Sequence, residues 1–241
     1  MQRFGRYSLR DIVVLLAIGG LIVWFYGGQS FGSPDRFLIF IAALVLAVTF
    51  HEFAHAFVAL QLGDATAKLL GRVSLNPIRH LDLFGSLAFL FVGFGWGKPV
   101  PINPYNMRGV SPMVGAAIAA LAGPASNVLL AFLATLPFRF GAPPGWVDLY
   151  TLRFIETLIA VNISLAAFNF LPIPPLDGFS LARLVLPRHI GAWLEQYGMF
   201  ILIALVFLPQ FGPLIGVRFD PLSAVMRPLQ SLIREIVFVG M

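Results

Sequence analysis

Residues 37–62 read FLIFIAALVLAVTFHEFAHAFVALQL, an apolar stretch that holds one acid and two histidines. Its length is close to the roughly 20 apolar residues that a helix needs to cross a bilayer. Pro34 and Asp35 before it are typical of a helix start, and Gly63 after it is typical of a helix end. We therefore expect a membrane-spanning helix with polar groups inside the membrane.

The composition excludes a water-soluble domain. Of the 241 residues, 59% are hydrophobic and only 11% are charged, whereas about a quarter of a soluble domain is charged. The net charge is +5, but the basic residues flank apolar stretches, which is typical of membrane borders and not of a nucleic-acid site. There is no cysteine, so a metal would be held by nitrogen and oxygen atoms.

Other apolar stretches predict further spans. Arg3, Arg6 and Arg10 precede an apolar run over residues 12–26, which predicts a retained signal-anchor helix with a cytoplasmic N-terminus. A secretory signal peptide is the alternative, but no small-residue cleavage site follows the run. Three more spans are expected at residues 114–137, 155–171 and 197–208. Residues 221–241 fit either an interfacial helix or a sixth span. The prediction is an all-α polytopic membrane protein with about five to six transmembrane helices, in a single domain over residues 1–241.

Residues 81–109 differ from these spans. They contain many glycines and prolines, which exclude a continuous helix, and Lys98 to Ile102 reads as extended chain. Non-helical backbone at membrane depth survives only where protein or a wet cavity surrounds it. We therefore expect a re-entrant loop or β-hairpin between the second and third spans; the alternative is one more short span followed by a surface loop.

The motif His51-Glu52-Phe53-Ala54-His55 lies within the second span. Histidines at i and i+4 share one helix face, so that both imidazoles reach one metal ion. Glu52 is placed to act on water as a general base. The alternative is a polar cluster packed between helices, although burying these groups in a membrane is costly without partners.

A catalytic zinc ion takes a third protein ligand and leaves one position open. His80 and His189 are candidates, but both lie outside the expected spans. Asp177 is a better candidate, because it follows the span at 155–171 through a proline-rich extended path and Gly178 allows a close turn. The alternative role for Asp177 is an N-cap of a helix that starts next to it.

Three separated motifs resemble the site-2 protease family of intramembrane zinc metalloproteases, peptidase family M50. They are His51 to His55, Gly123-Pro-Ala-Ser-Asn127, and Asn169 to Gly178. The chain looks like the compact prokaryotic type, without PDZ or CBS modules. The resemblance implies one zinc ion held by His51, His55 and Asp177, with Glu52 as the catalytic acid and base.

The resemblance also implies that Asn127 and Asn169 support the substrate or the transition state. For each asparagine the alternative is a hydrogen bond between helices, which is also what we expect of Asn162. Residues 71–77, with His80 and Asp82, resemble the small prokaryotic members, and we interpret them as a polar juxtamembrane loop.

The predicted function is that of a zinc-dependent intramembrane endopeptidase that cleaves transmembrane segments in regulated proteolysis. Its partners would be a membrane-protein substrate and the lipid bilayer, with no nucleic acid, and the sequence predicts no oligomeric state. The expected location is the prokaryotic cytoplasmic membrane. A metal-ion transporter or a zinc-binding scaffold without proteolytic activity is the alternative, because intramembrane histidines and acids also mark ion pathways.

Orientation ties these predictions together. With a cytoplasmic N-terminus the second span runs inward, and His51 lies about 21 Å along it at 1.5 Å per residue. The active site is then in the cytoplasmic half of the membrane. Asp177 reaches the same depth only if residues 81–109 do not cross, which favours the re-entrant interpretation.

Overall fold

The computed structural model describes residues 32–82, 85, 97–141, 145, 147–211 and 220–241, and within these ranges it contains helices and no strand. The signal-anchor helix expected at residues 12–26 lies outside the described residues. The helices are α2 (Pro34–Gln61), α3 (Thr66–Leu69), α5 (Pro112–Arg139), α6 (Leu149–Asn169), α7 (Asp177–Ala182), α8 (Arg188–Phe211) and α9 (Pro221–Val237), with 3₁₀ turns η1 (Pro77–Arg79) and η2 (Pro104–Asn106).

Four of the described helices, namely α2, α5, α6 and α8, are long and apolar enough to cross a membrane. They contain the spans expected at residues 37–62, 114–137, 155–171 and 197–208, apart from one or two residues at their ends. The prediction of an α-helical integral membrane protein is therefore confirmed. The total of five to six spans stays a prediction.

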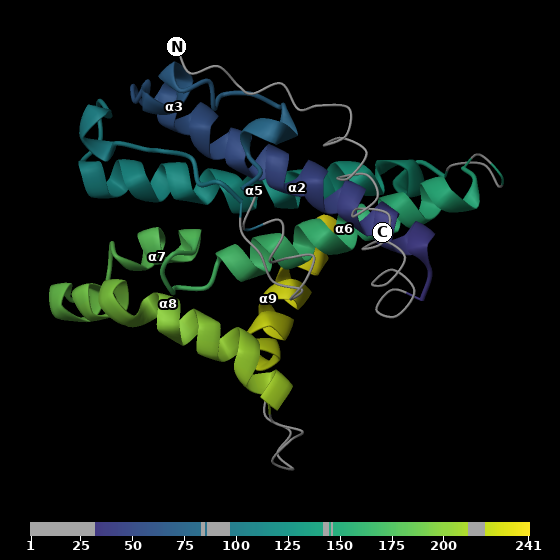
Figure 1. Cartoon of the computed structure of the whole chain (residues 1–241). Coiled ribbons are helices and arrows are strands. Elements are labelled where there is room, and N and C mark those ends of the chain that lie inside the picture. Colours follow the sequence, from purple (N-terminus) through teal and green to yellow (C-terminus); the bar gives the residue numbers. More distant parts are fainter. Residues whose placement is uncertain (1–31, 83–84, 86–96, 142–144, 146, 212–219) are drawn as a thin grey trace, which may run out of the picture.

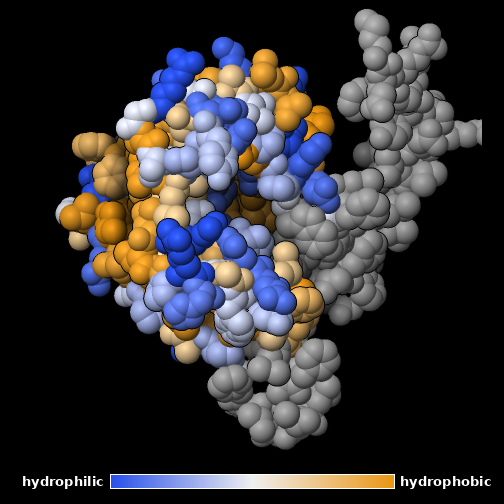
Figure 2. All heavy atoms as spheres, turned by 90° about the vertical axis from the view of Figure 1, so that its left-hand side faces the viewer, coloured by the Kyte–Doolittle hydropathy of each residue, from blue (hydrophilic) through white to orange (hydrophobic). Residues whose placement is uncertain are grey.

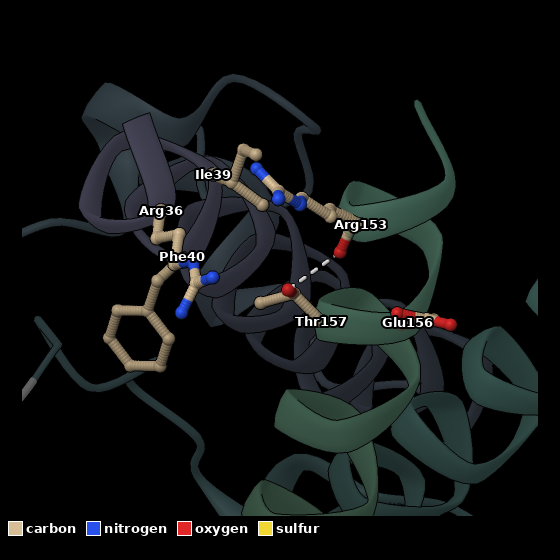
Figure 3. Close-up of a pocket in the computed structure, with 6 residues that line it drawn as sticks. All are labelled: Arg36, Ile39, Phe40, Arg153, Glu156 and Thr157. Carbon is tan, nitrogen blue, oxygen red and sulfur yellow. Dashed lines mark hydrogen bonds between the residues drawn. The ribbon is translucent and has the colours of Figure 1, made fainter. Parts of the chain in front are cut away.

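Helices α2, α5 and α6 form the bundle that carries the site (Figure 1). The first turns of α2 and α6 lie together, because Arg153 pairs with Asp35 at 3.3 Å, and Figure 3 shows Arg153 reaching toward Arg36 and Ile39. Helix α5 runs the opposite way, because Ala119 packs against Ala59 near the end of α2, whereas the later residue Asn127 contacts Ala47 farther back in α2. The bundle thus consists of two parallel helices and one antiparallel helix.

Small residues let these helices approach closely. Ala43 and Ala47 of α2 are fully buried against Leu158 of α6. Ala119 of α5 and Ala59 of α2 are buried in the same way where these two helices meet. Close packing of small side chains is how helices associate in lipid, where no hydrophobic driving force draws them together.

The C-terminal helix α9 packs across α5 and α6 and buries Ile233 and Val237 there. Gln230 of α9 donates a 3.2 Å hydrogen bond to Ser164 of α6, and Arg139 at the end of α5 donates to the carbonyl of Val237. The remaining face of α9 carries exposed charged residues. Residues 221–241 were expected to form either an interfacial helix or a sixth span. Helix α9 is not among the described helices that are long and apolar enough to span a membrane.

The connection from α2 to α5 leaves and rejoins the bundle at one end. The amide of Arg108 donates a 2.8 Å hydrogen bond to the carbonyl of Leu62, at the end of α2. Farther along, Leu81 and Gly97 form an antiparallel bridge, and the amide of Lys98 donates to the carbonyl of His80. Residues 83–84 and 86–96, which form the middle of the expected re-entrant region, lie outside the described residues.

Candidate metal centre

The two histidines of α2 face each other inside the bundle. His51 is 5% exposed and His55 is 6% exposed. One helical turn separates them, and their Nε2 atoms are 3.0 Å apart. Two buried imidazoles with nitrogen atoms this close predict one metal ion bound by both of them.

Each imidazole is oriented through its other ring nitrogen. Nδ1 of His55 donates a 2.8 Å hydrogen bond to the carbonyl of Ala119. Nδ1 of His51 donates a 2.6 Å hydrogen bond to Oδ1 of Asn127, whose Nδ2 donates to the carbonyl of Ala47. Because Nδ1 carries the proton in each ring, Nε2 is left with a lone pair for a metal.

Asp177 completes the group from the first turn of α7. Its Oδ2 atom is 3.1 Å from Nε2 of His51 and 3.3 Å from Nε2 of His55. Zinc ligands lie about 2.0–2.1 Å from the ion, so neighbouring corners of a tetrahedral site are about 3.3 Å apart. The three atoms therefore have the spacing of three corners around one zinc ion, and all metal-ligating atoms lie within 4.8 Å of one another.

The electrostatics of Asp177 also suit a cation. Oδ2 is buried and no described residue donates a hydrogen bond to it. It faces the Nε2 lone pairs of both imidazoles, so the three atoms are acceptors that share the need for a cation. The alternative N-cap role does not apply, because Leu176 occupies the cap position and α7 has no side-chain cap.

Two glycines make these close approaches possible. A Cβ atom on Gly123 of α5 would lie 2.3 Å from Nε2 of His55 and 2.7 Å from Cε1 of His51. A Cβ atom on Gly178 would lie 2.3 Å from the carbonyl oxygen of Phe170, at the end of α6. Only glycine lets α5 pass over the imidazoles and α7 begin against α6.

Glu52 lies beside the extended chain that follows residue 96. Its Oε2 atom accepts a 3.2 Å hydrogen bond from the amide of Val100. Gly97 is also adjacent, since a Cβ atom there would lie 3.9 Å from Oε1 of Glu52. The residue predicted as general base therefore contacts the segment that was expected to be extended.

The other candidates lie apart from this group. His80 is fully buried, but its Nε2 atom donates to the carbonyl of Ser74, and His189 is exposed on α8. Asn169 is half-buried at the end of α6, and its side chain donates to Leu165 in its own helix. Neither histidine joins His51, His55 and Asp177, and the role of Asn169 on a substrate stays a prediction.

Asn127 has the contacts between helices that were the alternative for it. It is fully buried and joins His51 and Ala47 of α2 to Asn162 of α6, whose Oδ1 accepts a 2.8 Å hydrogen bond from Nδ2 of Asn127. The prediction for Asn162, a hydrogen bond between helices, is confirmed. That Asn127 orients the first histidine was not foreseen from the sequence.

The chain aligns with a Bacillus subtilis protein named "Putative zinc metalloprotease YwhC", at 34% identity over 220 residues, which cover 81% of this chain and 99% of the relative. The chain belongs to peptidase family M50, the site-2 protease family. The M50 family model matches residues 145–209. Relatives include Rip2 of Mycolicibacterium smegmatis, at 28% identity over 82% of this chain and 78% of that protein. MJ0611 of Methanocaldococcus jannaschii is 30% identical over 72% of this chain and 83% of its own length.

No solved structure matches the chain. Rip2 and MJ0611 are likewise named "Putative zinc metalloprotease". Membership in M50, together with the spacing of the three ligating atoms, makes this M50 protein a zinc metalloprotease with a zinc cofactor. This confirms the predicted class of enzyme.

Proposed function

We propose that this M50 protein is an intramembrane endopeptidase that cleaves transmembrane segments of membrane proteins in regulated proteolysis, with one domain over residues 1–241. One observation carries the proposal. Nε2 of His51, Nε2 of His55 and Oδ2 of Asp177 converge within 4.8 Å of one another, and the two histidines lie on a helix that is apolar enough to cross a bilayer.

Each residue of the site has a chemical role in the proposal. His51, His55 and Asp177 hold the zinc ion, which when bound supplies Lewis-acid activation of water and of the substrate carbonyl. Glu52 accepts a proton from the attacking water and delivers it to the leaving amine. The chain thus supplies both the acid and the base for hydrolysis of a peptide bond.

The two asparagines have separate roles. Asn127 holds His51 in the tautomer that ligates zinc, as its 2.6 Å hydrogen bond to Nδ1 supports. Asn169 lies half-buried at the end of α6, a few residues before Asp177. Its side-chain oxygen is the group that supports a bound substrate.

A transmembrane substrate has to unwind before it is cut, because helical peptide bonds are shielded by their own hydrogen bonds. Lys98 to Ile102 offers extended backbone for edge pairing with an unwound strand. The contact of Val100 with Glu52 supports this role, because it puts that backbone directly beside the catalytic base.

Water has to reach a site inside the membrane. Figure 2 views the end of the molecule where α3 and α7 lie, and hydrophilic residues gather there around a recess in the surface. We place this end at the cytoplasmic side of the prokaryotic cytoplasmic membrane, with a cytoplasmic N-terminus. Asp35 and Arg153, at the starts of α2 and α6, then lie toward the outer side.

Residues 81–109 form a re-entrant loop or hairpin in this proposal. The hydrogen bond between Arg108 and Leu62 and the bridge between Leu81 and Gly97 support it, because both ends of the segment are held at one end of the bundle. The test is labelling of single cysteines at Asn103 and Val147 from either side of sealed vesicles. Labelling from opposite sides is expected, and labelling from one side contradicts the topology.

The test of the activity is cleavage of a single-span membrane protein by purified enzyme in detergent, with Glu52→Gln as the matched variant. The variant should lose cleavage and keep its zinc, because the amide cannot accept the proton. A wild type that moves zinc across liposomes and cuts no substrate would favour the transporter alternative.

A further inference from the structure

Arg72 is a buried arginine in the loop between α3 and η1, where the sequence predicted only a polar juxtamembrane loop. Its side chain and backbone together are 5% exposed. Nη1 donates to the carbonyl of Arg79 and Nη2 donates to the carbonyl of Lys98. A guanidinium is costly to bury, and in the described part of the chain it has no acid as a hydrogen-bonding partner.

The two carbonyls belong to chain segments on either side of the bridge between Leu81 and Gly97. The amide of Lys98 also donates a 2.8 Å hydrogen bond to the carbonyl of His80. Both backbone polar groups of Lys98 are thus held by the loop over residues 72–80. Arg72 fixes the point at which the extended segment leaves the bridge.

The segment reaches the catalytic base two residues later, where the amide of Val100 donates to Oε2 of Glu52. Next, the amide of Asn103 donates a 2.7 Å hydrogen bond to Asp64, just after α2. Residues 98–102 are therefore fastened by Arg72 at one end and by Asp64 at the other. The strand between these points lies next to Glu52.

Lys98 and Pro99 are exposed, and Val100 to Ile102 are half-buried. Within the described residues, the amide of Val100 is the one backbone group from Pro99 to Ile102 with a hydrogen bond, and Glu52 is its partner. The segment thus has carbonyls free to pair with another strand. Any shift at Lys98 changes where these carbonyls lie relative to Glu52.

We propose that Arg72 is a positioning residue for substrate binding, which sets the register of residues 98–102 against Glu52 by bridging the carbonyls of Arg79 and Lys98. The inference rests on the proposed function, because it assumes that an unwound substrate strand pairs with this segment. Arg72 then decides which substrate peptide bond lies beside the site.

Charge alone is a different explanation. Burial lowers the pKa of Arg72, and the nearby charge of Glu52 acts against this shift. A lysine at this position would keep a positive charge near Glu52, but its single ammonium group does not reproduce the planar fork that spans two acceptors. The Arg72→Lys variant therefore distinguishes an effect of bridging the two carbonyls from an effect of positive charge.

The test uses purified full-length enzyme and a single-span substrate, with kcat, KM, zinc content and melting temperature measured for Arg72→Met and Arg72→Lys. Lys68→Met is the matched control, since Lys68 is an exposed basic residue of α3, shortly before the same loop. We expect KM to rise about tenfold or more in both Arg72 variants, as for loss of charge-assisted hydrogen bonds. Zinc content should stay at the wild-type level, and the control should stay within about twofold.

A KM unchanged in Arg72→Met, or one restored by Arg72→Lys, overturns the inference. If the wild type cuts no substrate, it is the proposed function that fails. Should Arg72→Met not fold, disulfide crosslinking decides with Arg72→Lys, because the chain has no cysteine of its own. Both proteins carry Glu52→Gln, which prevents cleavage, and Lys98→Cys, which forms the crosslink to single cysteines along the substrate. The protein that keeps Arg72 should crosslink to one substrate position, and the Arg72→Lys variant should crosslink to several. An identical crosslinking pattern in the two proteins overturns the inference.

Discussion

His51 and Asn127 are joined by a 2.6 Å hydrogen bond from Nδ1 to Oδ1 that crosses from α2 to α5. Both residues are buried. Nδ2 of Asn127 donates to the carbonyl of Ala47 and to Oδ1 of Asn162, so the amide has one possible orientation. The Ala47 carbonyl thus orients the Asn127 amide, and Asn127 in turn keeps the proton on Nδ1 of His51, so that Nε2 is free to bind zinc.

Replacing Asn127 should therefore weaken zinc binding. For Asn127→Leu we expect a rise of about 10- to 100-fold in the Kd for zinc, as is typical when a partner of a ligating histidine is lost. Competition with a chelator of known affinity measures it. Asn169→Leu is the control, because Asn169 bonds within its own helix; it should lower kcat/KM and leave the Kd unchanged. Equal zinc affinity in Asn127→Leu and wild type would refute the role of Asn127.

Gly123 should tolerate no side chain. In Gly123→Ala the new methyl group would overlap the imidazoles of His55 and His51, so zinc content and cleavage should both fall by at least about tenfold. Gly191→Ala is the matched control, because a Cβ atom there meets nothing within 4 Å. A Gly123→Ala enzyme with full zinc content would show that α5 does not press on the site.

Asp64 should make the fold sensitive to acid. Burial acts to raise the pKa of Asp64, but hydrogen bonds from Thr66, Asn103 and Asn106 outweigh it and lower the pKa below its usual 3.8. A carboxyl with a lowered pKa contributes stability that is complete above about pH 5 and is lost as the pH falls through the folded value. Melting temperature in detergent against pH measures this.

In Asp64→Asn one carboxylate oxygen is replaced by an NH2 group, which cannot accept a hydrogen bond. We expect a loss of about 1–3 kcal/mol at neutral pH and a weaker dependence on acid below pH 4. Glu235→Gln, which changes an exposed acid of α9, serves as a control for general effects of losing a carboxylate. An acid dependence that survives unchanged in Asp64→Asn would assign it to other groups.

The spans and the metal ligands were predictable from the sequence because both depend on local pattern. An apolar run of sufficient length specifies a membrane helix, and the i, i+4 spacing of His51 and His55 specifies a shared face. Asp177 was predictable as a candidate because prolines and Gly178 shape its path. Its cap alternative could be excluded only from the structure.

Contacts between distant residues were not predictable. Nothing near Arg72 in the sequence distinguishes it from the exposed Arg79, and its burial depends on a carbonyl at Lys98. The hydrogen bond between Asn127 and His51 likewise depends on the register of α5 against α2. Such pairs follow from how small residues set the helix packing, and a single sequence does not give that register.

The zinc content of purified protein tests the central claim most directly, with wild type, Glu52→Gln and Asp177→Ala compared after dialysis against a weak chelator. The account predicts one zinc ion per chain in wild type and in Glu52→Gln. It predicts a loss of at least about 90% in Asp177→Ala, because a structure with two histidines alone lacks the third ligand of a catalytic site. Full zinc content in Asp177→Ala, or no zinc in wild type, would contradict it.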